Sequence, residues 1–549
     1  MPEQSPTEAE LIVSDQAEAA RAGRLRIRRT RRAIHVLTVV TLLTAAAFGS
    51  QAMAAAPATT PPPPPSTAQQ EKGMKAGAPL HDPADADTIA HPKLTITLDA
   101  TRTRFDLSGR EVQGDSYTGT FVAPTLHLAP GAKVTIKLVN HLPVATNLHF
   151  HGLHVSPSGQ SDDPFLCVAP GGSTTYQLAV PADHPLGTYW YHSHAMGTTC
   201  PDPNSPAAQA MQDMSGPDFK PGDVENQIFA GLSGALVVGD DRTLLPPALR
   251  HITAHTLVLK DVQIDPSGHI VQNTGSTSIN SNNPTVRLVN GQLRPVLSMK
   301  PGETQLWRLV NAGADIFYQP HLDGYHFTVI GEDGTPVSRM TTPDTLLLPP
   351  GKRYDVLVTA NSKPGRTTLR TTAYSNGPQG DSYPDAVLAT INVTGHAVRR
   401  LPTVSGAVPT APVDLSGRSV AQHRTLDLSE NADGTVFYIN GRQFSMDSSV
   451  FATPAKLGTV EEWTIVNQSG EDHPFHLHTS AFQVMSVNGV PQPYTHRQDI
   501  VPVPHAVNGV PGKVVVRVVF ADYPGRWMFH CHIAAHEDNG MMSYINVVP

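Results

Sequence analysis

Histidine, cysteine and methionine are concentrated in the last part of the chain, at positions whose spacing suits a metal. They are, in order, His530, Cys531, His532, His536 and Met541. A thiolate combined with two imidazoles and a weakly bound thioether selects copper, in the mononuclear form used for electron transfer. Such a site needs one more imidazole, which His473 can supply.

His530 and His532, on either side of Cys531, are then left over. Neighbouring side chains of a strand point to opposite faces, so both histidines would face away from the copper bound by Cys531. Three other histidine pairs share this i, i+2 spacing. They are His149 and His151, His192 and His194, and His476 and His478. Eight imidazoles suit a cluster of three coppers, and the cysteine would link it covalently to the mononuclear site.

Four short motifs contain these histidines. They read HFHG from position 149, YHSH from 191, HPFHLH from 473 and HCHIAAHEDNGMM from 530. In this order they resemble the four copper signatures of the three-domain multicopper oxidases, the laccase-like enzymes, here of bacterial type. The resemblance extends from about Thr95 to the end of the chain. An ordinary structural role could explain one histidine pair, but it does not explain four.

The resemblance implies a role for each motif position. The mononuclear blue copper would be bound by His473, Cys531 and His536, with Met541 as the axial ligand. One copper of the cluster would be bound by His149 and His476. The coupled pair would be bound by His151, His192, His194, His478, His530 and His532. With about four copper ions bound, such an enzyme oxidises its donor one electron at a time and reduces O₂ to two waters.

Reduction of O₂ consumes protons, so carboxylic acids are expected near the cluster. Glu537 directly follows His536, and its counterpart in the family is a proton donor. Asp162 or Asp163, shortly after the His151 motif, resembles the second acid. The alternative for all three is an exposed carboxylate in a turn.

Two internal repeats indicate the domain organisation. Similar segments that end in Val-Asn occupy 130–140, 301–311 and 457–467. They imply three copies of one β-domain. A second repeat aligns 187–194 with 525–532 without gaps. The middle copy of this repeat has Arg370 and Thr372 in place of the histidine pair, which predicts a copper-free spacer between two metal-binding domains.

Length and composition agree with three domains. The chain has 549 residues, and its 50 prolines and 43 glycines indicate many turns. The predicted fold is all-β, with three cupredoxin-like Greek-key β-sandwich domains. The expected segments are an export signal at 1–56, a Pro-rich linker at 57–88 and cupredoxin domains at 89–241, 250–396 and 405–549. The three-copper cluster would lie between the first and third domains.

The first 56 residues follow the pattern of an export signal, with a basic stretch, an apolar stretch and a small-residue cleavage pattern. The segment 30–34 resembles a twin-arginine signal, which exports folded proteins. We therefore expect an extracellular or cell-envelope protein. A membrane anchor is the alternative, although the apolar stretch is short for a span of ~20 residues. After export, Cys167 and Cys200 would form a disulfide or remain two separate thiols.

The predicted function is the oxidation of phenol-like donors coupled to the four-electron reduction of O₂ to water. Oxidation of Cu(I), Fe(II) or Mn(II), or of a bilirubin-type pigment, is the alternative, and the lack of a dense Met-rich segment mildly favours organic donors. A copper-free structural protein of the cell envelope would have lost ligands, and none is missing here. A formal net charge of −8 argues against nucleic acid as a partner. No protein partner is implied.

Overall fold

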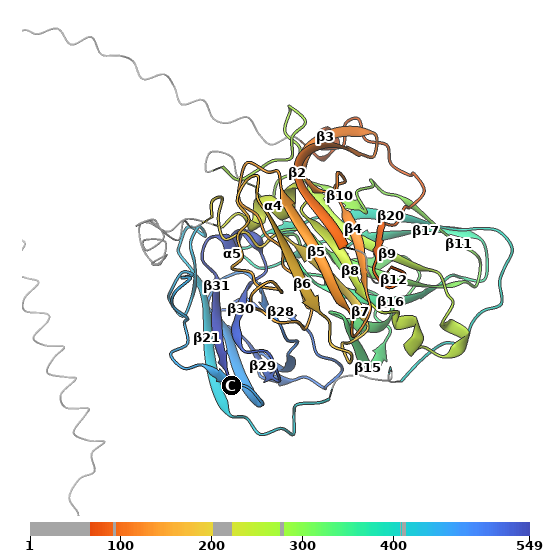
Figure 1. Ribbon diagram of the computed structural model, residues 1–549. Helices are drawn as coiled ribbons and strands as arrows, with labels where there is room; N and C mark the ends of the chain where they lie inside the picture. The colour runs from red at the N-terminus through yellow and green to blue at the C-terminus, as the bar shows by residue number, and fades with distance from the viewer. Residues whose placement is uncertain (1–65, 92–94, 201–221, 275–278, 407, 409–412) are drawn as a thin grey trace, which may run out of the picture. The chain divides into compact units, whose positions relative to one another are not determined.

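The computed structural model describes residues 66–91, 95–200, 222–274, 279–406, 408 and 413–549. The predicted export signal at 1–56 and the first part of the predicted linker, 57–65, lie outside the described residues. The regular secondary structure of the described chain is almost entirely strand, and the strands form three β-sandwiches (Figure 1). The predicted all-β fold is confirmed.

The first sandwich, orange and yellow in Figure 1, joins two four-stranded sheets around one hydrophobic core. One sheet has the order β1 (Asp85–Asp87), β4 (Ala123–Leu128), β8 (Ser233–Val238) and β7 (Gly187–His192). The other has the order β3 (Arg110–Tyr117), β2 (Thr95–Leu107), β5 (Lys133–Asn140) and β6 (Ser173–Ala179). The strand β7 ends at a predicted copper ligand.

The middle sandwich is drawn mainly in green in Figure 1. Its larger sheet has the order β10 (Val286–Val289), β9 (Ala254–Val262), β12 (Thr304–Asn311), β16 (Arg353–Thr359), β14 (Thr328–Glu332) and β15 (Thr335–Thr341). Its smaller sheet has the order β11 (Val296–Met299), β20 (Ala386–Val393), β17 (Gly365–Thr371) and β13 (Pro320–Leu322). A separate hairpin consists of β18 (Tyr374–Ser375) and β19 (Ser382–Tyr383).

The third sandwich, blue in Figure 1, contains the C-terminal motif. Its larger sheet has the order β22 (Phe437–Ile439), β21 (Gln422–Glu430), β24 (Thr459–Asn467), β29 (Gly512–Phe520), β26 (Gln483–Val487) and β27 (Val490–Pro491). Its other sheet has the order β23 (Ala455–Lys456), β31 (Met542–Val548), β30 (Gly525–Cys531), β25 (His473–Leu477) and β28 (Ile500–Val503). The adjacent strands β25 and β30 contain half of the copper ligands predicted for this domain, namely His473, His476, His530 and Cys531.

The first repeat seen in the sequence has a structural basis. Its strands β5, β12 and β24 each lie between one parallel and one antiparallel neighbour. Each strand ends in a fully buried asparagine, namely Asn140, Asn311 and Asn467. In every copy the side-chain amide donates to two backbone carbonyls and accepts from the backbone N–H two residues later. The asparagine thus fixes the turn that leaves the strand.

The linker prediction is wrong for the described part, 66–88. This segment forms the short helix α2 (Thr67–Gln70) and the strand β1, which pairs in parallel with β4. Glu71 forms an ion pair with Arg294 at 2.6 Å, and the Asp82 carboxylate lies 2.9 Å from His255 Nδ1. The strand β1 contains no proline, so its backbone N–H groups can pair with β4.

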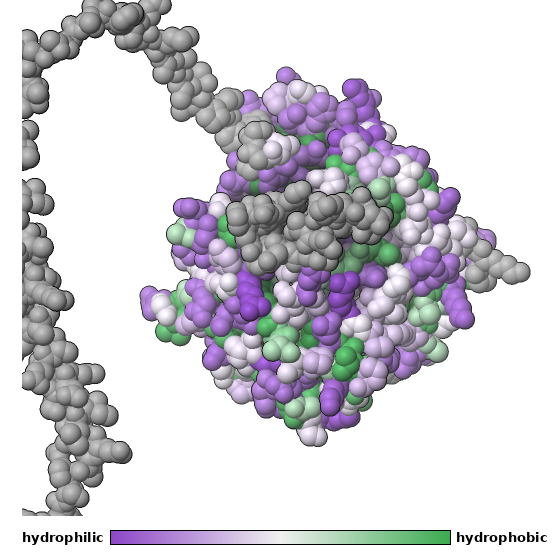
Figure 2. Space-filling model, turned by 60° about the vertical axis from the view of Figure 1, so that its left-hand side comes forward, coloured by the Kyte–Doolittle hydropathy of each residue, from purple (hydrophilic) through white to green (hydrophobic). Residues whose placement is uncertain are grey.

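Alternating side chains separate the core from the surface. In β29, Val514, Val516 and Val518 are buried, and the residues between them are partly exposed. The face shown in Figure 2 has hydrophobic residues scattered among hydrophilic ones. The remaining helical elements are short: α4 (Val224–Ala230), α5 (Ala534–Asp538), η1 (Asp241–Leu244) and η2 (Pro247–Leu249). Of these, α5 contains His536 and Glu537.

Candidate metal centre

Three predicted ligands of the mononuclear site meet in the third sandwich. The Cys531 sulfur lies 3.6 Å from His473 Nδ1 and 3.6 Å from His536 Nδ1. The two nitrogens are 3.3 Å apart. Cys531 ends β30, His473 begins β25, and His536 lies on α5. One sulfur and two nitrogens therefore enclose a space suited to a single ion.

The second ring nitrogen of His473 and of His536, Nε2, also has a polar partner. His473 Nε2 lies 2.8 Å from the Ser469 hydroxyl, and His536 Nε2 lies 3.2 Å from a carboxylate oxygen of Glu471. Such outer partners orient the ring and leave the other nitrogen for a metal. Met541 is fully buried, and its carbonyl accepts a hydrogen bond from the Cys531 N–H. The Met541 backbone thus lies directly beside the site formed by His473, Cys531 and His536.

The strand alternation predicted around Cys531 is present. His530 Nε2 lies 3.1 Å from His478 Nε2, and His532 Nε2 lies 3.2 Å from His151 Nδ1. Both rings therefore join other histidines, while the Cys531 sulfur faces His473 and His536. A single strand links the two predicted metal sites.

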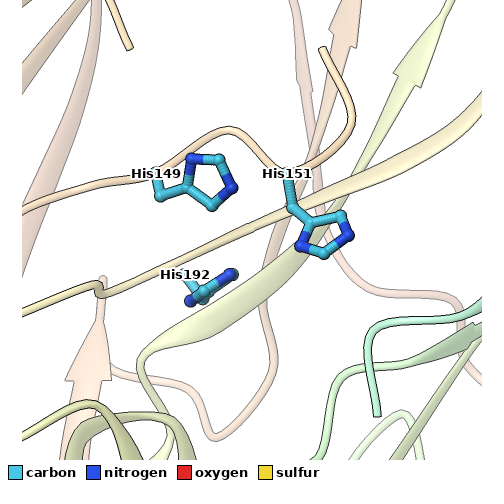
Figure 3. Close-up of side chains that lie close together, drawn as sticks. All are labelled: His149, His151 and His192. Carbon is cyan, nitrogen blue, oxygen red and sulfur yellow. The ribbon is translucent and has the colours of Figure 1, made fainter. Parts of the chain in front are cut away.

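The eight paired histidines gather in one region formed by the first and third sandwiches. Within each sandwich two motifs lie on paired strand segments: His149 is bridged to His192, and His476 is paired with His530. Between the sandwiches, the rings of His149 and His478 stack at 3.9 Å, and those of His151 and His476 stack at 3.8 Å. The rings of His149, His151 and His192 surround a common space (Figure 3).

The donor atoms fit copper. Within the part of the chain that the structure describes, nitrogens of six of these buried histidines have no hydrogen-bond partner. They belong to His149, His192, His194, His476, His478 and His532. Burial lowers the pKa of His192 to about 3 and that of His194 to about 4, so both are neutral near pH 7. Neutral imidazoles with free lone pairs are the form that binds a metal, and leaving them without partners would be costly.

The three predicted acids differ in position. Asp162 is buried, accepts the Phe150 N–H and lies 3.0 Å from His149 Nδ1. The two oxygens of buried Glu537 lie 3.2 Å from His194 Nε2 and 3.0 Å from His530 Nδ1. Asp163 is partly exposed and accepts the N–H of Phe165 instead. Of the two neighbouring aspartates, Asp162 is therefore the one beside a cluster histidine.

Two further residues at the cluster were not predicted from the sequence. Asp499 is buried, and its carboxylate lies 3.1 Å from His151 Nε2. Arg353 of the middle sandwich forms a bidentate ion pair with this carboxylate, at 2.7 and 2.6 Å. Neither residue has a motif spacing relative to the histidines, so the sequence contained no signal for them.

A cavity of about 580 Å³ opens beside the mononuclear site. His536 lines it, with the Phe437 ring stacked on the imidazole at 4.0 Å. The cavity is also lined by the carboxylic acids Glu225, Asp315, Asp381, Glu430, Asp433 and Glu471. Burial and the neighbouring Glu430 raise the pKa of Glu471 to about 9. Glu471 lies in the turn that leads into β25, two residues before His473.

Cys167 and Cys200 form a disulfide, with 5.6 Å between their Cα atoms. The first of the two alternatives left open by the sequence is therefore the one found. The bridge encloses the segment that contains His192 and His194. Among the described cysteines only Cys531 is free, as a thiolate ligand must be.

Comparison with known proteins agrees with this geometry. The stretches 99–203, 252–395 and 417–549 each match the family described as multicopper oxidase. The chain belongs to the multicopper oxidase family. It is accordingly a copper-dependent oxidoreductase that uses O₂, as the resemblance of the motifs predicted.

Individual relatives of this multicopper oxidase are distant but span most of its length. The multicopper oxidase mco of Staphylococcus aureus is 28% identical over 438 residues, which cover 78% of this chain and 83% of that protein. A laccase of Bacillus subtilis is 26% identical, and the match covers 78% of this chain and 89% of that protein. The structure of a multicopper oxidase from Campylobacter jejuni, described as a metallo-oxidase, has a TM-score of 0.70 at 24% identity. The match covers 87% of this chain and 96% of that chain. The last likeness concerns the fold alone.

Proposed function

We propose that this multicopper oxidase accepts electrons from small donors at the mononuclear site and reduces O₂ to water at the histidine cluster. The observation that supports this most directly is the placement of residues around Cys531. Its sulfur faces His473 and His536, and the adjacent His530 and His532 belong to the cluster. Copper bound at these sites supplies one-electron transfer and the four-electron reduction of O₂.

We assign the ligand roles from the positions and hydrogen-bond partners of the donor atoms. His473, Cys531, His536 and Met541 would hold the mononuclear copper, which would supply one-electron transfer. His149 and His476 hold the single copper of the cluster, since each has its Nδ1 engaged and its Nε2 free. One copper of the pair is held by His194, His478 and His530, whose nitrogens lie within 4.8 Å of one another. The other is held by His151, His192 and His532.

Two buried carboxyl groups handle protons. Glu537 lies beside His194 and His530, and Asp162 lies beside His149, so each reaches a different side of the cluster. A carboxyl group can pass a proton to reduced oxygen directly or through one water. Asp162 also fixes the orientation of the His149 ring, because it accepts a hydrogen bond from Nδ1–H.

Donors bind in the cavity beside His536. A phenol-like donor can stack on aromatic groups there and form a hydrogen bond between its hydroxyl and a carboxyl group. Phe437 and Glu471 are placed for these two tasks.

The carboxylates of the same cavity favour a second candidate, a metal cation such as Fe(II) or Mn(II). Oxygen ligands suit hard cations. Glu471 lines the cavity and lies 3.2 Å from His536 Nε2.

A panel of phenols, bilirubin, Cu(I), Fe(II) and Mn(II) separates the donor classes. Glu471→Gln should raise KM for the cations and leave KM for a neutral phenol nearly unchanged if cations are the substrate. An unchanged KM for the cations would exclude them as substrates that bind to Glu471. Consumption of one O₂ per four one-electron donors, with no peroxide released, tests the proposed O₂ reaction itself.

We also propose that the protein is exported. The pattern of 1–56 and the Cys167–Cys200 disulfide support this, because disulfides persist in oxidising compartments. No helix in the described residues is long and apolar enough to cross a membrane. Replacing Arg31 and Arg32 by Lys should leave the enzyme inside the cell if the signal is of the twin-arginine type. Unchanged export would exclude that type.

A further inference from the structure

Arg353 lies where the three sandwiches meet. It begins β16 in the middle sandwich and is fully buried. Its Nε donates to the carbonyl of Thr188 in the first sandwich, at 3.3 Å. Its two terminal nitrogens donate to the Asp499 carboxylate in the third, at 2.7 and 2.6 Å. One guanidinium thus connects all three sandwiches.

Asp499 in turn contacts two cluster histidines that belong to different sandwiches. Its carboxylate accepts from His151 Nε2–H at 3.1 Å, and its backbone carbonyl accepts from His476 Nδ1–H at 2.8 Å. In the proposed ligand set, His476 binds the single copper and His151 binds one copper of the pair. Asp499 is therefore the shared outer partner of two copper positions.

The contact with Asp499 also selects which nitrogen of His151 is free. His149 and His476 have Nδ1 engaged and present Nε2, whereas His151 has Nε2 engaged and presents Nδ1 toward His532. The outer hydrogen bond of a ligand histidine determines its tautomer and ring orientation. Without the Asp499 carboxylate, His151 would be free to present the other nitrogen.

The packing leaves this pair little room to move. Gly152, next to His151, has a φ of +84°, and a Cβ there would meet Asp499 Oδ2 and Arg353 Nη2 at 2.4 and 2.5 Å. The adjacent Lys352 donates to the Ile500 carbonyl at 3.1 Å, which holds the backbone next to Asp499. A bidentate arginine–carboxylate pair has a fixed geometry that a lysine cannot reproduce.

We propose that Arg353 is a positioning residue for the three-copper cluster, acting through Asp499 on His151 and His476. The middle sandwich then takes part in building the metal site, although its own repeat has no ligands. This inference rests on the proposed function, because it assumes copper at the histidine cluster.

The test compares Arg353→Lys with Arg424→Lys in copper-loaded enzyme. Arg424 forms a bidentate pair with Glu461, at 2.6 and 2.8 Å, that is also buried but lies within the third sandwich, and it serves as the matched control. Arg353→Lys should change the electron paramagnetic resonance signal of the single cluster copper and speed loss of cluster copper to a chelator ~10- to 100-fold, the usual effect of removing an outer partner. The signal and absorption of the blue copper should remain parental. Arg424→Lys should leave both copper signals unchanged.

Parental cluster signals and copper retention in Arg353→Lys would overturn the proposal, and so would equal changes in Arg424→Lys. If Arg353→Lys does not fold, Asp499→Asn provides the test. It preserves the backbone carbonyl that holds His476 but alters the group that holds His151, so it should perturb the coupled pair more than the single copper. An unchanged pair in this variant also overturns the proposal. Failure of the parental enzyme to bind about four coppers would instead contradict the proposed function.

Discussion

The buried asparagine that ends each repeat strand can be tested in two copies with different consequences. We compare Asn467→Ala in the third sandwich with Asn311→Ala in the middle one. Asn467 makes three hydrogen bonds to backbone groups, at 2.7, 3.1 and 2.9 Å, and Asn311 makes three at 2.8, 2.9 and 3.1 Å. Each such bond contributes about 1 kcal/mol net, so each substitution should lower the free energy of unfolding by about 3 kcal/mol.

The two substitutions should differ at the copper site. The turn after Asn467 contains Ser469, beside His473 Nε2, and Glu471, beside His536 Nε2. Asn467→Ala should therefore weaken the blue absorption as well as the fold, whereas Asn311→Ala should reduce stability alone. Urea denaturation followed by circular dichroism measures the loss of stability. Visible absorption of the copper-loaded enzyme measures the loss of blue colour. Equal bleaching in both variants, or a stability loss below about 1 kcal/mol in either, would refute the reasoning.

Three further predictions concern the enzyme directly. Glu537→Gln should preserve copper content and reduction of the blue copper but slow O₂ turnover by ~100-fold, because the amide cannot ionise; turnover at the parental rate would assign the proton transfer to another acid. Met541→Leu should raise the potential of the blue copper in electrochemistry, because a non-coordinating side chain destabilises Cu(II), and an unchanged or lower potential would exclude Met541 as the axial ligand. Replacing Cys167 and Cys200 together by serine should lower the unfolding free energy by about 4 kcal/mol, given their sequence separation of 33, and an unchanged denaturation midpoint would show that the bridge adds no stability.

The directions in which the side chains around Cys531 point could be predicted from the sequence because they depend on local backbone geometry. The alternation of a strand places Cys531 opposite His530 and His532, and this follows from the backbone alone. The repeats likewise indicated which strands are equivalent, and the equivalent neighbours of β5, β12 and β24 agree with that alignment.

The residues that could not be predicted act between sandwiches. Arg353 and Asp499 are 146 positions apart, and their pairing depends on how two sandwiches pack. The choice between Asp162 and Asp163 depends on which carboxylate turns toward His149, and the two share one sequence environment. The segment 66–88 was predicted as a linker from its prolines, but its order comes from pairing with β4 and ion pairs with the middle sandwich.

The central claim is that copper is bound at two sites, by the third sandwich alone and between the first and third sandwiches. Anomalous scattering at the copper edge from crystals of the copper-loaded enzyme tests it most directly. We expect one peak enclosed by His473, Cys531 and His536, three peaks among the eight paired histidines, and none within 250–396. A fully occupied copper inside the middle sandwich, or an empty histidine cluster after full loading, would contradict the account.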